Sequence, residues 1–463
     1  MLCVVIKGPL FSDAYRQVGE ALLYADLIEL RLDYFTTLSL TGLKEFCSQF
    51  AVPMIFTLRS QLDGGGYKQS EEKRLAQILA LAELLPAYLD LEHHVSSDFI
   101  REIAAHYPSI RLIRSYHDCI KTPEYAELEA IYAELQDPRV SLYKIAAHAN
   151  HHLDAMRLLC WNRASDPALI PISMGPLGGL SRILGPIVQN PITYAFLEEP
   201  FHAQLLVERY RHYSLSPKTA IYGLIGNPIG RSIGDETHNQ WFAIRGLDAV
   251  YVKIQLDPSD LAEFLSYAKQ LGFKGLSVTM PLKEAILPYL DACDSKASEI
   301  GAVNTVVFEE DRILGYNTDG VGALDALERE IDPNNLKVAI MGTGGTAQAI
   351  AHEALCRGAR VTILGRDAEK ALKIAKKLGC ASGGESALLE CDLLINCTPV
   401  SPSIDSVALS PHLLLMDVRV KPEDNAFLNK GRAKGCRTLD GLCMFFEQAA
   451  GQQRIWFKLL AQK

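Results

Sequence analysis

Short apolar runs alternate with amphipathic stretches along roughly the first 210 residues of the chain. The runs expected to form strands are CVVIK, LIELRL, MIFTLR, YLDLE, IRLIRSY, SLYKIA and LIPISM. The stretches between them, such as residues 71–85, place apolar residues at helical spacing and so predict helices. Strands that alternate with helices form parallel βαβ units, and seven or eight units in about 210 residues predict a (β/α)8 barrel.

In such a barrel the chemistry collects where the strands end. The polar residues expected at those ends are Glu29, Arg31, Arg59, His117, Lys144 and Arg182.

A second pattern begins after the polar, proline-containing stretch at 212–220, which predicts a domain boundary. Residues 337–367 predict a strand, a glycine turn, a helix and a second strand. Gly342, Gly344 and Ala347 match G-x-G-x-x-A, with Gly345 in the same turn. The first glycine permits the tight turn, the second lets the backbone approach a pyrophosphate, and the small third residue permits close helix packing. The context therefore predicts a Rossmann dinucleotide site.

The residues after the second strand bear on the choice of cofactor. An NAD site usually has an acid there to hold the ribose 2′-hydroxyl, whereas an arginine suits the 2′-phosphate of NADP. This chain offers Arg366, followed by Asp367. The arginine favours NADP, and the adjacent carboxylate keeps NAD open.

Composition limits the remaining possibilities. A length of 463 residues predicts two or three domains, and a net charge of −9 argues against a broad nucleic-acid surface. No apolar run approaches the roughly 18–20 residues that span a bilayer. The first residues enter a strand pattern with no export or import signal, so we expect a cytoplasmic protein without a membrane or nucleic-acid partner.

The eleven cysteines are scattered without a C-x-x-C pair, which fits a reducing compartment. His148, His151 and His152 lie close together, but neither an H-E-x-x-H motif nor a cysteine accompanies them. The sequence therefore predicts no metal.

Lys144 lies in an apolar run, where an ammonium is costly unless it is paired or gives up its proton. A neutral amine attacks ketones to form a Schiff base, which acidifies the adjacent carbon. His117 is a candidate base for that proton, and Arg182 a candidate for holding a carboxylate. In the alternative interpretation Lys144 points outward to a surface acid and His117 is a core histidine.

These stretches resemble the type I 3-dehydroquinate dehydratase family over nearly all of residues 1–210. The matching motifs are IELRLDY, FTLRS followed by GG, SYHD with KTP, YKIA, and SMG with LSR. The resemblance implies that Lys144 forms the Schiff base, that His117 is the general acid–base, and that Arg182 takes the substrate carboxylate. It implies further substrate-binding positions at Glu29, Arg31, Arg59, Asp63 and Gln204.

Two positions depart from that family. Asp63 stands where the family usually has a glutamate, one methylene longer, so we expect a weaker hydrogen bond orienting His117. The family's lid sequence S-A-P-G-Q is PFHAQ here, with Pro200 in place of the serine.

In the second half, Lys283 and Asp319 lie at loop positions beside Asn304 and Thr279. A cation paired with a carboxylate near a nicotinamide suits carbonyl reduction, because hydride reaches carbon while an acid protonates the oxygen. The alternative is a plain ion pair that closes a domain interface.

This half is similar to the shikimate dehydrogenase family from about residue 220 to the end. The motifs are GNPIGRSIG, GLSVTMPLKE, IGAVNTV and GYNTDGVG. The resemblance implies that Lys283 and Asp319 form the catalytic dyad and that the glycine turn and Arg366 bind NADP. It implies that the substrate is held by Ser232, Thr279, Asn304 and Gln448.

Here too there are departures. Gly234 replaces the second serine of the family's S-x-S, and Val420 replaces a tyrosine near the nicotinamide. Our hypothesis is that the neighbouring Arg231 compensates for the lost serine hydroxyl.

Together the resemblances imply a bifunctional enzyme of aromatic amino acid biosynthesis, which dehydrates 3-dehydroquinate and reduces the resulting 3-dehydroshikimate to shikimate with NADPH. The expected domains are the barrel (1–212), a substrate domain (219–320), a Rossmann domain (321–438) and a C-terminal helix that returns to the substrate domain (439–463). Two alternatives stay open: a quinate-type dehydrogenase with relaxed substrate or NAD use, and a non-catalytic sensor of the same metabolites.

Overall fold

The structure is a computed structural model that describes residues 1–164, 166–197, 215–402, 409–420 and 425–458. The chain divides into two compact units, Met1–Thr219 with Glu263–Leu271 and Ala220–Ala262 with Gly272–Lys463. The first residues of the expected boundary at 212–220 lie outside the described part of the chain.

The first unit contains an eight-stranded parallel sheet in the order β7-β6-β5-β4-β3-β2-β1-β8. Its strands are β1 (Leu2–Ile6), β2 (Leu27–Arg31), β3 (Met54–Thr57), β4 (Tyr88–Glu92), β5 (Arg111–Asp118), β6 (Leu142–His148), β7 (Leu169–Met174) and β8 (Thr193–Ala195). The sheet curls into a barrel that is almost closed, with β7 and β8 as its two ends.

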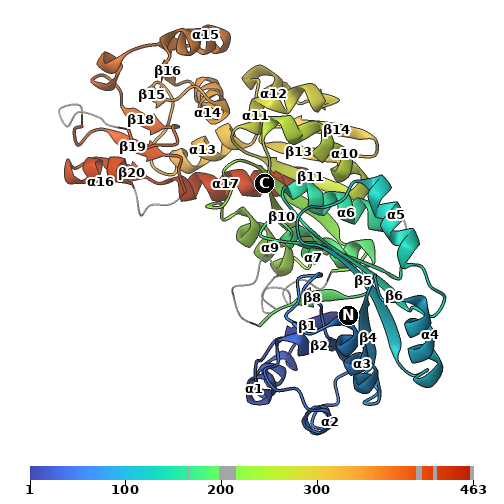
Figure 1. The fold of residues 1–463 in the computed structure, drawn as a ribbon. Coiled ribbons are helices and arrows are strands. Elements are labelled where there is room, and N and C mark those ends of the chain that lie inside the picture. The colour runs from blue at the N-terminus through green and yellow to red at the C-terminus, as the bar shows by residue number, and fades with distance from the viewer. Residues whose placement is uncertain (165, 198–214, 403–408, 421–424, 459–463) are drawn as a thin grey trace. The chain divides into compact units, whose positions relative to one another are not determined.

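Helices follow the strands, and α1 to α4 lie on the outside of the barrel (Figure 1). The helices are α1 (Phe11–Ala21), α2 (Leu40–Ser48), α3 (Glu71–Ala82), α4 (Ser97–His106), α5 (Tyr125–Leu135), α6 (His152–Ala164) and α7 (Gly179–Leu184), with 3-10 turns η1 (Leu32–Tyr34) and η2 (Gly185–Val188). The Ser70 hydroxyl caps α3 by accepting a hydrogen bond from the Lys73 N–H. The helix expected over 71–85 is present, but it ends at Ala82, three residues earlier than expected.

The barrel prediction is confirmed, and all seven expected strands are present. The eighth strand, β8, has only three residues, too few to show an apolar period in the sequence. Its pairing with β1, where Leu2 lies opposite Thr193, makes it a strand.

Side chains alternate between the two faces of each barrel strand, as the pleat requires. One face packs against the helices, for example with Ile28, Phe56 and Leu89. The other face forms the barrel interior, where Tyr88 and Ala146 pack together. Positions two residues along from these interior residues carry polar side chains, which is why a ring of charge forms inside the barrel.

The second unit begins with a six-stranded mixed sheet in the order β10-β9-β11-β13-β14-β12. Its strands are β9 (Ala220–Gly226), β10 (Ala249–Gln255), β11 (Phe273–Val278), β12 (Ala292–Cys293), β13 (Thr305–Glu309) and β14 (Arg312–Tyr316). The helices in this stretch of the chain are α9 (Gly234–Ile244), α10 (Leu261–Leu271), α11 (Leu282–Ala285) and α12 (Ser295–Ile300), with η3 (Pro258–Asp260) and η4 (Leu287–Tyr289). Most of α10, Glu263–Leu271, belongs to the first compact unit.

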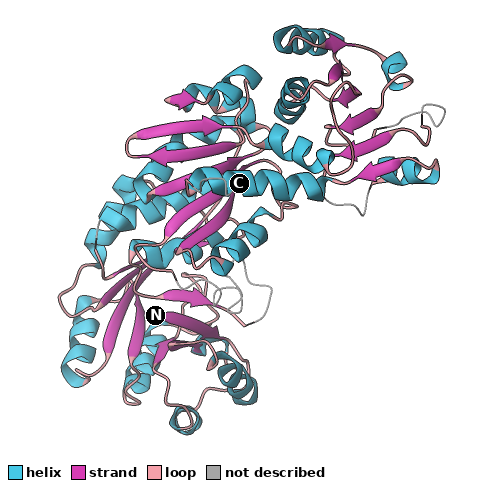
Figure 2. Cartoon of the chain, turned by 180° about the vertical axis from the view of Figure 1, so that it is seen from behind, coloured by secondary structure: helices cyan, strands magenta, loops and turns pink. Residues whose placement is uncertain are grey.

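A second, all-parallel sheet follows in the order β17-β16-β15-β18-β19-β20. Its strands are β15 (Lys337–Met341), β16 (Arg360–Leu364), β17 (Ala381–Ser382), β18 (Leu393–Asn396), β19 (Leu414–Asp417) and β20 (Arg437–Leu439). The helices of this part are α13 (Asp319–Glu328), α14 (Gly345–Cys356), α15 (Ala368–Leu378), α16 (Ala426–Ala433) and α17 (Gly441–Trp456), with η5 (Glu385–Leu388). Helices flank these strands in Figure 2. The strand order is 3-2-1-4-5-6, the Rossmann order, whose ligand crevice lies at the switch between the first and fourth strands, here β15 and β18.

None of the helices in the described segments is long and apolar enough to cross a membrane.

Helix α9 places His238 in the core of the mixed sheet. The ring stacks on Tyr251 at a centroid distance of 4.5 Å, and its Nδ1 accepts a hydrogen bond of 3.1 Å from the Gln453 amide. Burial lowers the pKa of His238 to about 3, against an ordinary value of 6.5. The imidazole is therefore neutral in the folded protein.

Acidification is expected to destabilise this half through His238. Below pH 6.5 the unfolded chain binds a proton that the folded chain does not, so the free energy of unfolding falls by about 2 kcal/mol between pH 7 and pH 5. Urea unfolding followed by hydrogen exchange of peptides from β9 to β11 measures this. His238→Leu should flatten the pH dependence, and the exposed His412→Ala should not. An unchanged pH dependence in His238→Leu would contradict the assignment.

Candidate active sites

Lys144 lies inside the barrel on β6, two residues before Ala146 on the same face. Its Nζ is 3.1 Å from Asp90 Oδ2 and 3.6 Å from Glu29 Oε1, and it lies over the Tyr194 ring at 4.6 Å. The alternative of an outward-pointing lysine is wrong. Of the two ways in which a buried lysine can be accommodated, the structure shows pairing, because two buried carboxylates flank the amine.

Asp90 is the centre of a wider network. Arg59 lies 2.8 Å from Asp90 Oδ2 and donates a hydrogen bond of 2.7 Å to the Ser115 hydroxyl. Ser115 in turn donates one of 2.5 Å to Asp90 Oδ1. Burial alone raises the pKa of Asp90, but Arg59 and Lys144 outweigh it and hold that pKa well below its usual range. The residue is therefore a fixed negative charge beside Lys144.

His117 lies near the end of β5. Removal of the ring from water, followed by the charges of Arg59 and Lys144, holds the pKa of His117 well below its ordinary 6.5. The Nδ1 atom is buried and has no hydrogen-bond partner in the described part of the chain. The structure thus presents a neutral imidazole with an unused nitrogen, as a general base requires.

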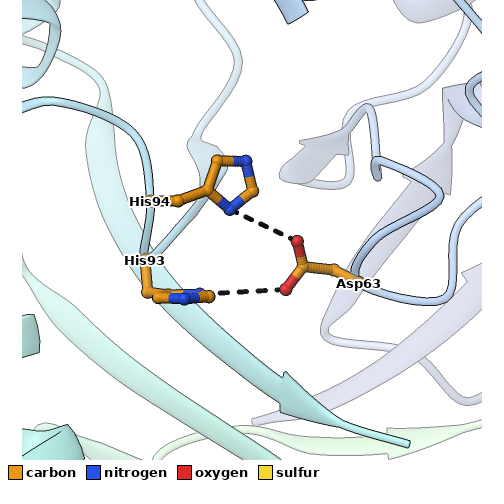
Figure 3. A group of neighbouring side chains, drawn as sticks. All are labelled: Asp63, His93 and His94. Atoms are coloured by element: carbon orange, nitrogen blue, oxygen red, sulfur yellow. Dashed lines mark ion pairs between the residues drawn. The ribbon is translucent and has the colours of Figure 1, made fainter.

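Asp63 does not orient His117. It lies in the loop after β3 and contacts His93 and His94, which follow β4 (Figure 3). The Ser60 hydroxyl also donates a hydrogen bond of 3.0 Å to its Oδ2. The expected weak hydrogen bond to His117 is therefore corrected to none, because this carboxylate is directed toward the two other histidines.

Arg182 in α7 is a buried cation with spare donors. Its NH1 donates a hydrogen bond of 3.2 Å to the Tyr194 carbonyl, while its Nε is buried and has no hydrogen-bond partner among the residues that the structure describes. Burial lowers the pKa of Arg182 to about 10. A buried guanidinium with an unsatisfied donor suits an anionic ligand.

Arg31 differs, because Asp33 already binds its guanidinium in bidentate fashion at 3.0 and 2.8 Å. Glu29, by contrast, faces Lys144 and accepts a hydrogen bond of 2.8 Å from the Thr57 hydroxyl. Gln204 and Pro200 lie outside the described residues.

In the second unit Lys283 and Asp319 form an ion pair. The Lys283 ammonium also donates a hydrogen bond of 2.8 Å to the hydroxyl of Thr346, the second residue of α14. Asn304 donates a hydrogen bond of 2.7 Å to the other Asp319 oxygen, Oδ1. A lysine, an aspartate and an amide are thus held together beside the N-terminus of the Rossmann helix α14.

Of the other expected substrate positions, only Gln448 has a hydrogen bond to this cluster among those recorded for the described residues. Asn304 also donates to Gln448 Oε1 at 3.3 Å, so Gln448 belongs to the cluster. Thr279 follows the last residue of β11, and its N–H donates to the Ile225 carbonyl at 2.9 Å. Ser232 lies before α9, where its hydroxyl accepts a hydrogen bond from the Gly234 N–H at 3.1 Å.

The glycine turn fits a dinucleotide. Gly342 has φ +128°, a conformation that favours glycine, and a Cβ there would lie 3.1 Å from the Cys397 carbonyl oxygen. A Cβ on Gly344 would meet nothing within 4 Å, so the space above the turn is open. Gly345 begins α14, whose N-terminal N–H groups suit a phosphate.

The end of β16 favours a 2′-phosphate. Arg366 is exposed there. Asp367 uses its carboxylate to accept a hydrogen bond of 2.9 Å from the Lys370 N–H, which caps α15. The aspartate that kept NAD open in the sequence is thus engaged as a helix cap.

Sequence reasoning missed three residues of these sites: Asp90, Ser115 and Thr346. Asp90 had a signal, because the alternation in YLDLE places Asp90 and Glu92 on one strand face. Ser115 and Thr346 had none, since isolated hydroxyl residues in a strand and a helix are common. Only their contacts show that they belong.

Comparison with known proteins agrees with this geometry. Residues 2–212 match the model of type I 3-dehydroquinase, residues 224–306 that of the shikimate dehydrogenase substrate binding domain, and residues 337–415 that of NADP oxidoreductase, coenzyme F420-dependent. The last match covers β15 and the strands that follow it up to β19.

Two similar proteins extend over almost the whole chain. The shikimate biosynthesis protein AroDE of Chlamydia pneumoniae is 33% identical over 469 residues, covering 99% of this chain and 95% of that protein. The bifunctional 3-dehydroquinate dehydratase/shikimate dehydrogenase of Arabidopsis thaliana, described as chloroplastic, is 31% identical over 480 residues, covering 95% of this chain and 79% of that protein.

A crystal structure of a shikimate dehydrogenase in complex with NADP+ matches 53% of this chain and 92% of its own, with 34% identity and a TM-score of 0.51. NADP is the cofactor of the second half. The chain belongs to the bifunctional 3-dehydroquinate dehydratase/shikimate dehydrogenase family of the shikimate pathway.

Proposed function

We propose that the barrel converts 3-dehydroquinate to 3-dehydroshikimate through Lys144 and His117, and that the second unit reduces this product to shikimate through Lys283 and Asp319. The observation that carries the proposal is the pairing of a lysine with buried carboxylates in each unit: Lys144 with Asp90 and Glu29, and Lys283 with Asp319. The product of the first reaction is the substrate of the second.

In the barrel, the Lys144 amine adds to the substrate ketone and water leaves, giving a protonated Schiff base. The positive iminium draws electrons from the adjacent carbon, so the neutral His117 can take a proton from it. The resulting electron pair forms a carbon–carbon double bond as the neighbouring hydroxyl leaves, protonated by the same imidazole. Water then hydrolyses the iminium and frees Lys144.

Substrate binding in the barrel rests on Arg182, whose unsatisfied guanidinium takes the carboxylate. Glu29, Arg31 and Arg59 contribute as further binding residues, with Asp63 and Gln204 as positions carried by the family resemblance. The fixed charge of Asp90 stabilises the iminium at Lys144, because the two lie 3.1 Å apart.

In the second unit, NADPH supplies the hydride when it is bound at the glycine turn. Lys283, held by Asp319 and Thr346, donates a proton to the carbonyl oxygen as the hydride reaches carbon. Ser232, Thr279, Asn304 and Gln448 hold the ring hydroxyls and the carboxylate. Gly234 and Val420 remove two of the family's contacts, and Arg231, exposed before α9, is the proposed replacement for the lost serine.

We place the protein in the cytoplasm, with the three small metabolites as its partners. All eleven cysteines are free thiols, which is the state expected in a reducing compartment.

One experiment tests both reactions. The protein is incubated with 3-dehydroquinate and borohydride, and its mass and peptide map are determined while NADPH absorbance is followed without borohydride. We expect an adduct of substrate size on Lys144 and oxidation of NADPH from 3-dehydroquinate alone. The absence of both would favour the sensor alternative, and oxidation of quinate with NAD⁺ as the hydride acceptor would favour the quinate-type dehydrogenase.

Arg366→Ala is expected to raise KM for NADPH roughly tenfold or more, because a charge-assisted hydrogen bond to the 2′-phosphate is lost. KM for NADH should stay within about twofold, because NADH lacks that phosphate and therefore has no hydrogen bond at this position to lose. Steady-state kinetics with both cofactors measures the effect, and the exposed Lys373→Ala on α15 is the control. Equal changes in KM for NADPH and NADH would show that Arg366 does not bind the 2′-phosphate.

A further inference from the structure

A cluster of three metal-ligating side chains lies at the ends of β3 and β4, and only one of them, Asp63, is also a substrate-binding position implied by the family resemblance. Asp63 comes from the loop after β3, and His93 and His94 from the turn after β4 (Figure 3). Asp63 Oδ1 is 3.8 Å from His93 Nδ1, and Asp63 Oδ2 is 3.4 Å from His94 Nδ1. One ligand atom from each residue lies within 4.8 Å of the other two.

These separations suit a shared ion. Zn²⁺ binds imidazole nitrogen and carboxylate oxygen at about 2.0–2.1 Å in tetrahedral geometry, which separates neighbouring ligand atoms by about 3.3 Å. The measured 3.8 and 3.4 Å run to the two different Asp63 oxygens, and one ligand atom from each residue lies within 4.8 Å of the others, so side-chain rotations would bring the three atoms to this spacing. Three protein ligands leave the fourth tetrahedral position for water, as in catalytic zinc sites.

The lone pairs are available for an ion. The Nδ1 atom of His93 is buried and has no hydrogen-bond partner in the described chain, although a carboxylate oxygen faces it at 3.8 Å. A buried nitrogen is costly to leave unsatisfied, and a cation between it and Asp63 would satisfy both. An ordinary hydrogen-bonded His–Asp pair would be closer.

The surrounding contacts orient the ligands as metal sites require. His94 turns its other nitrogen, Nε2, toward Glu71 Oε1 at 3.5 Å, as the outer ring nitrogen of a metal-bound histidine turns toward a carboxylate. The Ser60 hydroxyl donates a hydrogen bond of 3.0 Å to Asp63 Oδ2. The backbone N–H of His93 donates one of 2.7 Å to the Ser115 carbonyl. Both the carboxylate and the histidine turn are thereby held in place.

We propose that Asp63, His93 and His94 form a binding site for a divalent transition-metal ion of the Zn²⁺ type. The expectation of no metal came from the lack of a local ligand motif. This site has none, because its ligands come from two loops 30 residues apart in the chain that parallel strand pairing brings together.

The test uses the full-length protein, stripped with chelator and titrated with Co²⁺, whose visible absorption is intense in tetrahedral sites. We expect one Co²⁺ per chain with such a spectrum, and its displacement by one equivalent of Zn²⁺. His94→Ala should weaken Co²⁺ binding by about 100-fold or more, and Glu71→Gln by roughly tenfold, because it removes the carboxylate that orients His94. Glu71 also forms a bidentate pair with Arg74, so the melting temperature of this variant is compared with that of the unaltered protein. The exposed His106→Ala should leave binding unchanged.

No tetrahedral spectrum in the unaltered protein, or the same affinity in His94→Ala, would overturn the proposal, the latter by placing the ion at other histidines. The melting temperature of each variant shows whether it is folded. If His94→Ala does not fold, Glu71→Gln decides alone, and unchanged affinity in that variant overturns the site.

Discussion

Replacing Lys144 with alanine or arginine is expected to lower kcat/KM for 3-dehydroquinate by about 10⁴-fold or more, because neither side chain can form the imine. Arginine is the sharper test, since it keeps a positive charge beside Asp90 and Glu29 and removes only the nucleophile. Asp90 retains Arg59 as a partner at 2.8 Å in either variant, so the barrel should remain folded.

Product formation from 3-dehydroquinate measures the effect, and mass analysis after borohydride should show no adduct. Reduction of added 3-dehydroshikimate by the same sample is the internal control and should stay within about twofold, as expected for sites that act independently. Lys121→Ala, at an exposed lysine of the barrel, is the matched control. Dehydration at a tenth or more of the original rate would rule out Lys144 as the nucleophile.

Asp319→Asn is expected to lower kcat for reduction of 3-dehydroshikimate by about 10²- to 10⁴-fold, the usual range for loss of positioned proton transfer. The substitution keeps the shape of the side chain and the Asn304 contact, but it removes the charge that holds the Lys283 ammonium. Because the substrate contacts remain, KM should change much less than kcat.

NADPH oxidation with saturating 3-dehydroshikimate measures this loss, and dehydration by the same sample is the internal control. Asp325→Asn lies on the same helix, α13, and removes a carboxylate paired with Arg357 instead, so it should have little effect on reduction. If kcat of Asp319→Asn stays within about threefold of the original, the loss is too small for a role in proton transfer. The Lys283–Asp319 pair would then be a structural ion pair.

Much of the architecture could be predicted from local pattern. Seven of the barrel strands and the strand–turn–helix–strand of the Rossmann sheet follow from apolar period and turn glycines, which act over a few residues. Helix α3 ended earlier than its apolar period, because that period does not mark where backbone hydrogen bonding stops. Strand β8 was missed because its three residues are too few to show an apolar period, and only its pairing with β1 defines it as a strand.

The charged residues divide in the same way. That Lys144 is buried could be seen in its apolar strand, and that Arg366 follows β16 could be seen in the Rossmann spacing. Which carboxylate meets Lys144 could not, because Asp90 lies on β4, 54 positions away, and parallel register brings the two together. The partners of Asp63 and Asp367 were also beyond the sequence, since Asp63 was judged from the family resemblance and Asp367 from its residue type and position.

The sequence by itself thus determined most of the elements, and its motifs, through their family resemblance, determined the order of the two enzymes and the lysines proposed to carry their chemistry, since these depend on short-range periodicity and motif spacing. Only the tertiary structure decided which partner each charge has: Asp90 for Lys144, Thr346 for Lys283, a helix cap for Asp367 and two histidines for Asp63. The physical reason is that a side chain pairs with whatever the folded backbone places within a few ångströms, and that distance depends on strand register and loop path.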